Sequence, residues 1–204
     1  MDWAFERHGL LAPGYERTRT IVGLDLFEAV ALLAPENTPE RTVQDLCATY
    51  KEVFVQHRSA PDFTEALYDG AQSALTALAN DNWLLGVSTG KSRRGLDVVL
   101  DKHDLRQYFD TIWCADDGPG KPHPFMCLEA MGAVGAEPHQ TLMIGDAVHD
   151  MRMAKAAGIT ALGVTWGFGN LDELRDAGAD DVFTRFEDLN RALQGFSPIP
   201  AAAK

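Results

Sequence analysis

The sequence predicts an α/β fold in which a parallel sheet is accompanied by a small all-helical domain. From residue 67 onward, short apolar runs alternate with helical patterns of about ten to fifteen residues, an order typical of βαβ units. Residues 1–66 contain helix signals and no convincing strand. Polar residues also follow successive apolar runs, where open parallel sheets bind their ligands. Together these observations favour a Rossmann-like sheet with helices on both faces.

The predicted sheet domain covers residues 67–195, and a flexible tail is expected over residues 196–204 because "SPIPAAAK" carries no helix or strand pattern. Each predicted strand is a short apolar run that follows a helical pattern such as "GAQSALTALAND". The runs are residues 83–89, 111–117, 141–146, 160–166 and 180–186.

The helical domain is expected over residues 1–66. In "GLDLFEAVALLAPE", Asp25 is a candidate N-cap with Glu28 three residues later, in the manner of a capping box, and Pro35 ends the helix. A second helix is predicted from "TPERTVQDLCATYKEVFVQH", which opens with a threonine and a first-turn proline. Its apolar face is formed by Leu46, Tyr50, Val53 and Phe54.

Composition excludes several classes of partner. The chain has 204 residues, 46% hydrophobic and 24% charged, with a net charge of −12, which argues against nucleic acid and against an anionic membrane surface. No run approaches the ~18 apolar residues of a membrane helix. The widely spaced Cys47, Cys114 and Cys127 indicate reduced thiols and a cytoplasmic location. A small phosphorylated substrate remains possible, and the sequence does not indicate an oligomeric state.

The ends of three predicted strands carry the candidate functional residues. Thr89 and Gly90 follow the first strand, Lys121 lies in the loop "PGKPHPF" after the second, and Asp146 and Asp150 follow the third. Taken alone, each has a simpler explanation. Thr89 and Asp146 could cap the helices that follow them, and Lys121 could be a solvated loop lysine. Their shared position at strand ends indicates a common site.

These residue types suit phosphoryl transfer. A hydroxyl and backbone N–H groups can hydrogen-bond phosphoryl oxygens, and a lysine places a compact positive charge against developing negative charge. A carboxylate at a strand end can hold Mg²⁺, which prefers oxygen ligands. A second carboxylate can orient the lysine or the metal's waters.

The arrangement resembles the haloacid dehalogenase-like (HAD) hydrolase superfamily, and within it the phosphoglycolate-phosphatase-like branch. "GVSTGKS", "GKPHPF" and "IGDAVHDMRMAKAAG" look like the family's second, third and fourth motifs. The resemblance implies that Thr89, Gly90 and Lys121 bind substrate, that Asp146 binds Mg²⁺, and that Thr89, Lys121 and Asp150 serve catalysis. It also implies that the helical domain is the inserted cap.

The family's first motif, a strand ending in DxDG[TS] that carries the nucleophilic Asp, does not occur in this sequence. The family's sheet places that strand between the strands ending at Thr89 and Asp146, so we expect those two edges to lack a neighbour. We also expect the chain to be inactive by itself and not to fold cleanly. The explanation we favour is a start at an internal methionine or a truncation. There are two alternatives. Either the protein has lost catalysis, or the strand is supplied by another chain or was left out.

The function implied is a Mg²⁺-dependent hydrolase of small phosphate monoesters, similar to phosphoglycolate phosphatase. One alternative is a non-catalytic, regulatory protein that binds a phosphorylated ligand and needs no nucleophile. The other is a haloacid dehalogenase, against which the metal-type pair Asp146 and Asp150 speaks, because halide displacement needs no Mg²⁺.

Overall fold

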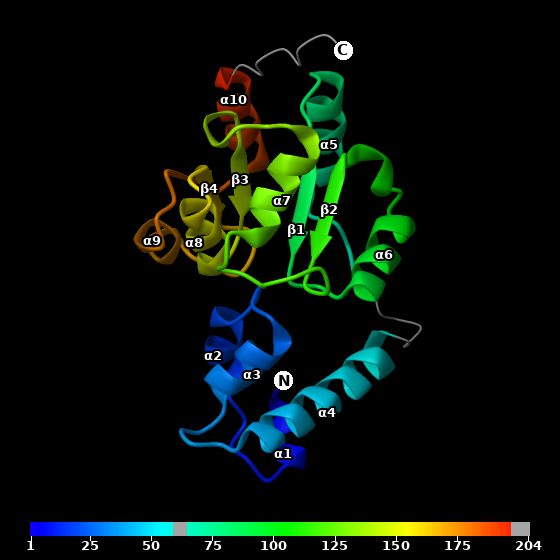
Figure 1. Ribbon diagram of the computed structural model, residues 1–204, viewed down its shortest axis with the longest axis vertical. Helices are drawn as coiled ribbons and strands as arrows, with labels where there is room; N and C mark the ends of the chain where they lie inside the picture. The colour runs from blue at the N-terminus through cyan, green and yellow to red at the C-terminus, as the bar shows by residue number, and fades with distance from the viewer. Residues whose placement is uncertain (59–64, 197–204) are drawn as a thin grey trace. The chain divides into compact units, whose positions relative to one another are not determined.

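The computed structural model describes residues 1–58 and 65–196 and divides the chain into two compact units, Met1–Ala66 and Leu67–Lys204 (Figure 1). We call them the helical unit and the sheet unit and describe each by itself. Of the predicted tail, residues 196–204, only Phe196 lies within the described residues.

The helical unit contains four α-helices around one apolar core in its described part. Asp25 caps α3 by accepting the N–H groups of Phe27 at 2.8 Å and Glu28 at 3.4 Å, so the predicted helix start is confirmed. Phe5, Val30 and Leu46 are fully buried in the core. The helices are α1 (Asp2–Arg7), α2 (Gly14–Thr20), α3 (Leu26–Leu33) and α4 (Glu40–Arg58).

The predicted apolar face of α4 is only partly buried. Leu46 and Val53 lie in the interior, whereas Phe54 is 38% exposed. The Phe54 ring stacks on that of Tyr50, one helical turn earlier, with 5.6 Å between the ring centroids. The helix therefore covers part of its own apolar surface with a neighbouring aromatic ring.

The sheet unit confirms the predicted α/β fold. Its strands are β1 (Gly86–Thr89), β2 (Thr111–Cys114), β3 (Leu142–Gly145), β4 (Thr160–Val164) and β5 (Asp181–Phe183). Each lies inside one of the five apolar runs. The helices are α5 (Ala71–Asn80), α6 (Arg93–Lys102), η1 (Arg106–Tyr108), α7 (Phe125–Val134), η2 (Pro138–Gln140), α8 (Val148–Ala156), α9 (Leu171–Asp176) and α10 (Phe186–Gly195).

In the described part of the chain, the strands form two parallel sheets, one of β1 and β2 and the other with the strand order β3-β4-β5. Figure 1 shows β1 and β2 side by side. Thr89 is in register with Cys114, and Gly145 with Gly163. The edge of β1 away from β2 and the edge of β3 away from β4 have no strand partner among these elements. Backbone N–H and C=O groups on such edges are available for pairing.

The exposure of residues in the strands follows the pairing of the strands. β4 has a neighbour on each side, and its residues from Ala161 to Val164 are buried. On β3, Ile144 is 37% exposed, and Leu84, just before β1, is 52% exposed. Apolar side chains at strand ends and edges of a sheet with helices on both faces are normally covered, so the surface near β1 and β3 is unusually open.

Two helices connect the sheets from opposite faces. On one face, Cys127 of α7 contacts Met143 of β3, with 3.8 Å between their sulfur atoms, while α7 also packs on β1 and β2. On the other face, Leu75 of α5 belongs to the cluster that contains Val87 of β1. Leu78, one turn later, belongs to the cluster around Leu162, which β3 joins through Leu142. The sheets are thus joined by side-chain packing.

Candidate functional site

Lys121 and Asp150 form a buried ion pair. The Lys121 Nζ lies 2.5 Å from Asp150 Oδ1, and the two residues are only 6% and 3% exposed. Asp150 Oδ2 also accepts the Ala147 N–H at 3.1 Å, so the carboxylate is bonded through both oxygens. The interpretation of Lys121 as a solvated loop lysine is therefore wrong. Buried charges persist only when paired and hydrogen-bonded, as this pair is.

A glycine at the end of β3 allows this pair to form. Asp150 belongs to the first turn of α8, and its side chain packs directly over Gly145. A Cβ at position 145 would come within 2.3 Å of the Asp150 Cβ, closer than non-bonded carbon atoms approach in folded proteins. The Gly-Asp sequence after the strand thus brings the helix close enough for Asp150 to meet Lys121.

Asp146 is held by the loop that follows β4. Its Oδ2 accepts the Phe168 N–H at 3.1 Å, and its backbone carbonyl accepts the Gly169 N–H at 2.7 Å. A Cβ at Gly167 would lie 1.9 Å from Asp146 Oδ2, so no larger residue fits there without moving the carboxylate. Ala147 occupies the N-cap of α8, so the alternative that Asp146 caps this helix is wrong.

Burial raises the pKa of Asp146 above its ordinary value, and the neighbouring charge of Asp150 raises it further. The Phe168 N–H and the Lys121 ammonium act in the opposite direction without cancelling these effects. A cation placed beside Asp146 would lower this pKa again, because it favours the charged form.

The carboxylates fit one part of a magnesium site. The Asp150 carboxylate already bonds the Lys121 ammonium and the Ala147 N–H. The Asp146 carboxylate instead accepts a hydrogen bond from an uncharged group, the Phe168 N–H. Residues 1–58 and 65–196 contain no group of three or more His, Cys, Asp or Glu that could hold a metal. Mg²⁺ commonly uses one or two carboxylates plus waters and substrate phosphates, so Asp146 suits the role of a single protein ligand.

Thr89 and Gly90 lie at the end of β1, in the two-stranded sheet. The Thr89 Oγ1 accepts the Lys91 N–H at 3.2 Å, and the N-cap of α6 is Ser92, which accepts the Gly95 N–H at 3.3 Å. The alternative that Thr89 caps this helix is therefore wrong. The structure brings Lys121, Asp146 and Asp150 together, while Thr89 ends β1 and Gly90 follows it. The arrows of β1 and β3 point the same way in Figure 1.

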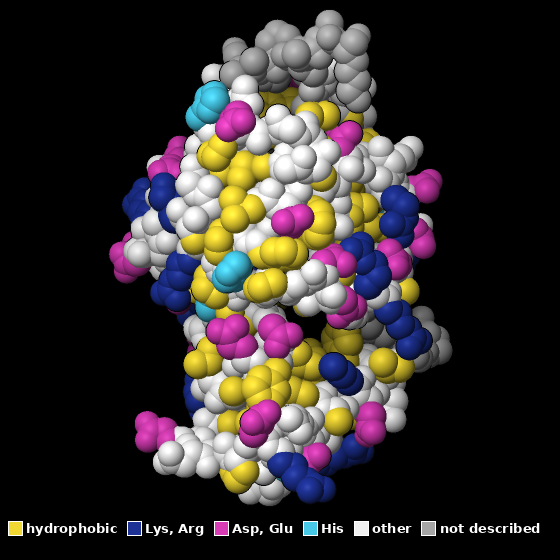
Figure 2. All heavy atoms as spheres, viewed as in Figure 1, with side chains coloured by type: hydrophobic (Ala, Val, Ile, Leu, Met, Phe, Trp, Pro, Cys, Tyr) yellow, Lys and Arg dark blue, Asp and Glu magenta, His cyan; other side chains and the backbone are white. Residues whose placement is uncertain are grey.

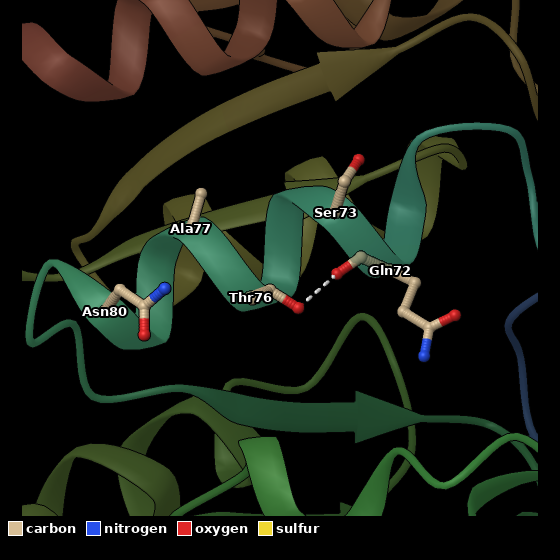
Figure 3. A pocket seen from close by; sticks show the side chains of 5 residues that line it. All are labelled: Gln72, Ser73, Thr76, Ala77 and Asn80. Carbon is tan, nitrogen blue, oxygen red and sulfur yellow. Dashed lines mark hydrogen bonds between the residues drawn. The ribbon is translucent and has the colours of Figure 1, made fainter.

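An open depression of the sheet unit lies elsewhere, over α5. It has a volume of about 680 Å³ and is lined by Gln72, Ser73, Thr76, Ala77 and Asn80 (Figure 3). None of these side chains is charged, and the Thr76 hydroxyl donates to the Gln72 carbonyl at 2.9 Å. The depression offers no cation for a phosphate group, so it is not the candidate site.

On the face drawn in Figure 2, Lys and Arg side chains are interspersed with Asp and Glu. Among the described helices, none combines the length and apolar character needed to cross a bilayer.

The sequence did not identify the residues that position the candidate site residues. Gly167 and Phe168 lie in "VTWGFG", a segment that resembles the family branch but assigns neither residue a role, and Arg93 belongs to none of the motifs. Gly167 and Gly169, separated by one residue after β4, were the sequence signal that another segment approaches the backbone closely at this point.

Comparison with known proteins identifies relatives. A family model described as haloacid dehalogenase-like hydrolase matches residues 2–164. IndB of Dickeya dadantii, named a probable phosphatase, is 32% identical over 188 residues, covering 90% of this chain and 81% of that protein. A phosphoglycolate phosphatase of Nitrosococcus oceani is 25% identical over 194 residues, covering 94% of this chain and 86% of the relative.

Solved structures support the fold. A predicted phosphatase from Clostridium acetobutylicum superposes with a TM-score of 0.80 at 22% identity, covering 95% of this chain and 88% of that one. A hydrolase from Pseudomonas syringae gives 0.79 at 23% identity, with the same coverage of 95% and 88%. At these identities the likeness concerns the fold alone.

Proposed function

Because the chain belongs to the haloacid dehalogenase-like hydrolase family, we propose that it is part of a Mg²⁺-dependent hydrolase of small phosphate monoesters, similar to phosphoglycolate phosphatase. The observation that carries this proposal is the buried pair of Lys121 and Asp150 beside Asp146. An ammonium and two carboxylates at the ends of parallel strands suit an anionic substrate and a divalent cation together.

Each candidate residue has a proposed role. Lys121 holds phosphoryl oxygens through its ammonium, and Asp150 fixes the direction of that ammonium through the 2.5 Å contact. The Thr89 hydroxyl and the Gly90 N–H donate to other phosphoryl oxygens. Asp146 is the protein ligand of Mg²⁺, which when bound supplies positive charge against the phosphoryl group. The helical unit, residues 1–66, is proposed to be the family's cap domain.

We further propose that the nucleophilic Asp lies on a strand that pairs with both β1 and β3. The sequence contains no DxDG[TS] motif, and the two edges that face this position have no strand partner among the described elements. An unsatisfied buried backbone group costs about 1–3 kcal/mol. A parallel strand of about five residues would pair these groups and end beside Asp146 and Thr89.

By resemblance to the family, the Asp of that strand attacks phosphorus, and the ester oxygen leaves with a proton from a second Asp. Water then hydrolyses the aspartyl phosphate and releases inorganic phosphate. In this scheme the 204-residue chain contributes binding and orientation, and it has no turnover by itself.

The test compares three proteins on phosphoglycolate: the 204-residue chain, a version extended before Met1 by an apolar strand and a DxDG[TS] loop, and the same extension with its first Asp changed to Asn. Mg²⁺-dependent release of phosphate is expected only from the second. Release by the unextended chain would contradict the proposed division of roles. Hydrolysis of a haloacid that survives EDTA would instead favour a dehalogenase.

A second candidate function is a non-catalytic binder of a phosphorylated ligand, which the lack of DxDG[TS] in the sequence favours. It predicts that phosphoglycolate raises the melting temperature of the 204-residue chain in a saturable manner. It also predicts that the extended version releases no phosphate, which separates it from the enzyme.

A further inference from the structure

We propose that Arg93 is a positioning residue that fixes the loop carrying Lys121 to the loop carrying Thr89. The ligand that both loops would share rests on the proposed function, whereas the positioning itself rests on contacts within the sheet unit. No sequence motif used above includes this role.

Arg93 lies at the start of α6, four residues after Thr89, and contacts the loop that follows β2. Its guanidinium Nη2 donates to the Asp117 carboxylate in a very short ion pair and to the Ile112 carbonyl at 3.3 Å. Its backbone N–H donates to Asp116 Oδ2 at 2.8 Å. One residue therefore makes three bonds to β2 and to the loop after it.

The loop after β2 is also bonded to its own strand and to the Thr89 loop. Asp117 Oδ2 accepts the Cys114 N–H at 2.8 Å, and the Ala115 N–H donates to the Lys91 carbonyl at 3.1 Å. The Arg93 bond and the Cys114 N–H hold the pKa of Asp117 below its ordinary value, although burial acts to raise it. Asp117 therefore stays charged and bound to Arg93 at neutral pH.

The segment between Asp117 and Lys121 is Gly118-Pro119-Gly120. Glycines give such a segment little conformational preference of its own. Gly118 packs under the Phe125 ring, where a Cβ would come within 2.3 Å of Phe125 Cε1. The His123 N–H donates to the Gly120 carbonyl at 2.9 Å. Phe125 and His123 therefore hold the loop on the α7 side, and Arg93 holds it on the β2 side.

Loss of the Arg93 bonds should release the β2 side of the loop. Lys121 would then leave Asp150 part of the time and become accessible to solvent. In the intact protein its 6% exposure protects it, whereas the Lys155 side chain is 45% exposed and serves as an internal reference.

The experiment measures acetylation of individual lysines by acetic anhydride, with peptide mass spectrometry, on the 204-residue chain well below its melting temperature. Arg93→Met should raise the rate at Lys121 about fivefold or more relative to Lys155, because local opening becomes more frequent. Arg93→Lys, which keeps one charge, should restore part of the protection.

Arg106→Met is the matched control. Arg106 follows the same helix, and its guanidinium bonds Asp97 at 2.8 Å and Asp101 at 3.2 Å, which both lie on that helix and not in either loop. It should leave Lys121 protected. The proposal is overturned if Arg93→Met leaves the Lys121 rate unchanged, if Arg106→Met raises it equally, or if all lysines rise together.

A second measurement separates this inference from the proposed function. Isothermal titration with inorganic phosphate, on the extended protein and its Arg93→Met variant, should show an affinity about tenfold weaker in the variant. Failure of the parent protein to bind phosphate would count against the proposed function alone, because the acetylation result decides the role of Arg93.

Discussion

The Lys121 ammonium and the Asp150 carboxylate meet at 2.5 Å although they follow strands of different sheets: Lys121 follows β2, and Asp150 lies in the first turn of the helix after β3. Like the side-chain packing of α5 and α7, this ion pair joins the two sheets. Both charges are buried away from water, so each is stabilised by the other instead of by solvent.

Lys121→Met should destabilise the sheet unit strongly, because it leaves the Asp150 carboxylate buried without its cation. We expect a loss of about 3–5 kcal/mol in the free energy of unfolding by urea. Lys155→Met is the control, because Lys155 forms an exposed pair with Asp180 at 2.8 Å, and exposed pairs contribute about 0–1 kcal/mol. Equal losses of unfolding free energy in the two variants would show that the buried pair stabilises the fold no more than the exposed one.

Gly167→Ala should displace the Asp146 carboxylate, since the new Cβ would lie 1.9 Å from Asp146 Oδ2. The expected result is Mg²⁺ affinity lower by about tenfold or more, measured by titration calorimetry on the extended protein. Gly132→Ala is the control, because a Cβ there meets nothing within 4 Å and the residue lies inside α7. That change should stabilise the protein by up to about 1 kcal/mol and leave Mg²⁺ affinity unaltered.

Asp180 gives a pH-dependent prediction. The Ala161 N–H at 2.8 Å and the Lys155 ammonium lower its pKa in the folded state. A lowered pKa stabilises the fold above the unfolded value of about 3.9, and the contribution disappears as the pH falls through the folded value. Asp180→Asn should therefore lose about 0.5–1 kcal/mol at pH 7. The difference from the parent should shrink toward zero in acid, as urea melts at several pH values would record. A loss that stays constant with pH would exclude a charge effect.

The cysteines give a prediction about reactivity. Burial raises the pKa of the Cys127 thiol to about 11, and Asp150 adds to the rise while Lys121 opposes it. Burial likewise raises the pKa of Cys47 and Cys114. Since the thiolate is the reactive form, iodoacetamide at pH 8 should modify the native protein slowly and the urea-unfolded chain quickly. Rapid native modification at Cys127 would contradict the buried environment.

Local signals and strand-end positions carried most of what the sequence could predict. Asp25 and Glu28 marked a helix start correctly because a cap depends on residues within one turn. Lys121, Asp146 and Asp150 were grouped from their positions after strands, and the structure brings these three together. Their roles remain proposals.

The supporting contacts could not be predicted because they join distant segments through geometry. The bond from the Phe168 N–H to Asp146 spans 22 residues, and that from Arg93 to Asp117 spans 24. A backbone donor has no sequence signature, and one arginine among several charged neighbours does not reveal its partner. The fit of Gly167 against Asp146 likewise appears only when two loops are placed side by side.

The edges of β1 and β3 that have no strand partner among the described residues also affect how the protein behaves in concentrated solution. Such edges are templates on which strands of other molecules can add, and exposed Ile144 makes this addition more favourable. The net charge of −12 opposes close approach, but salt screens it. Colloidal stability is thus expected to fall with ionic strength, so low-salt buffers are the natural choice for storing and crystallising this chain.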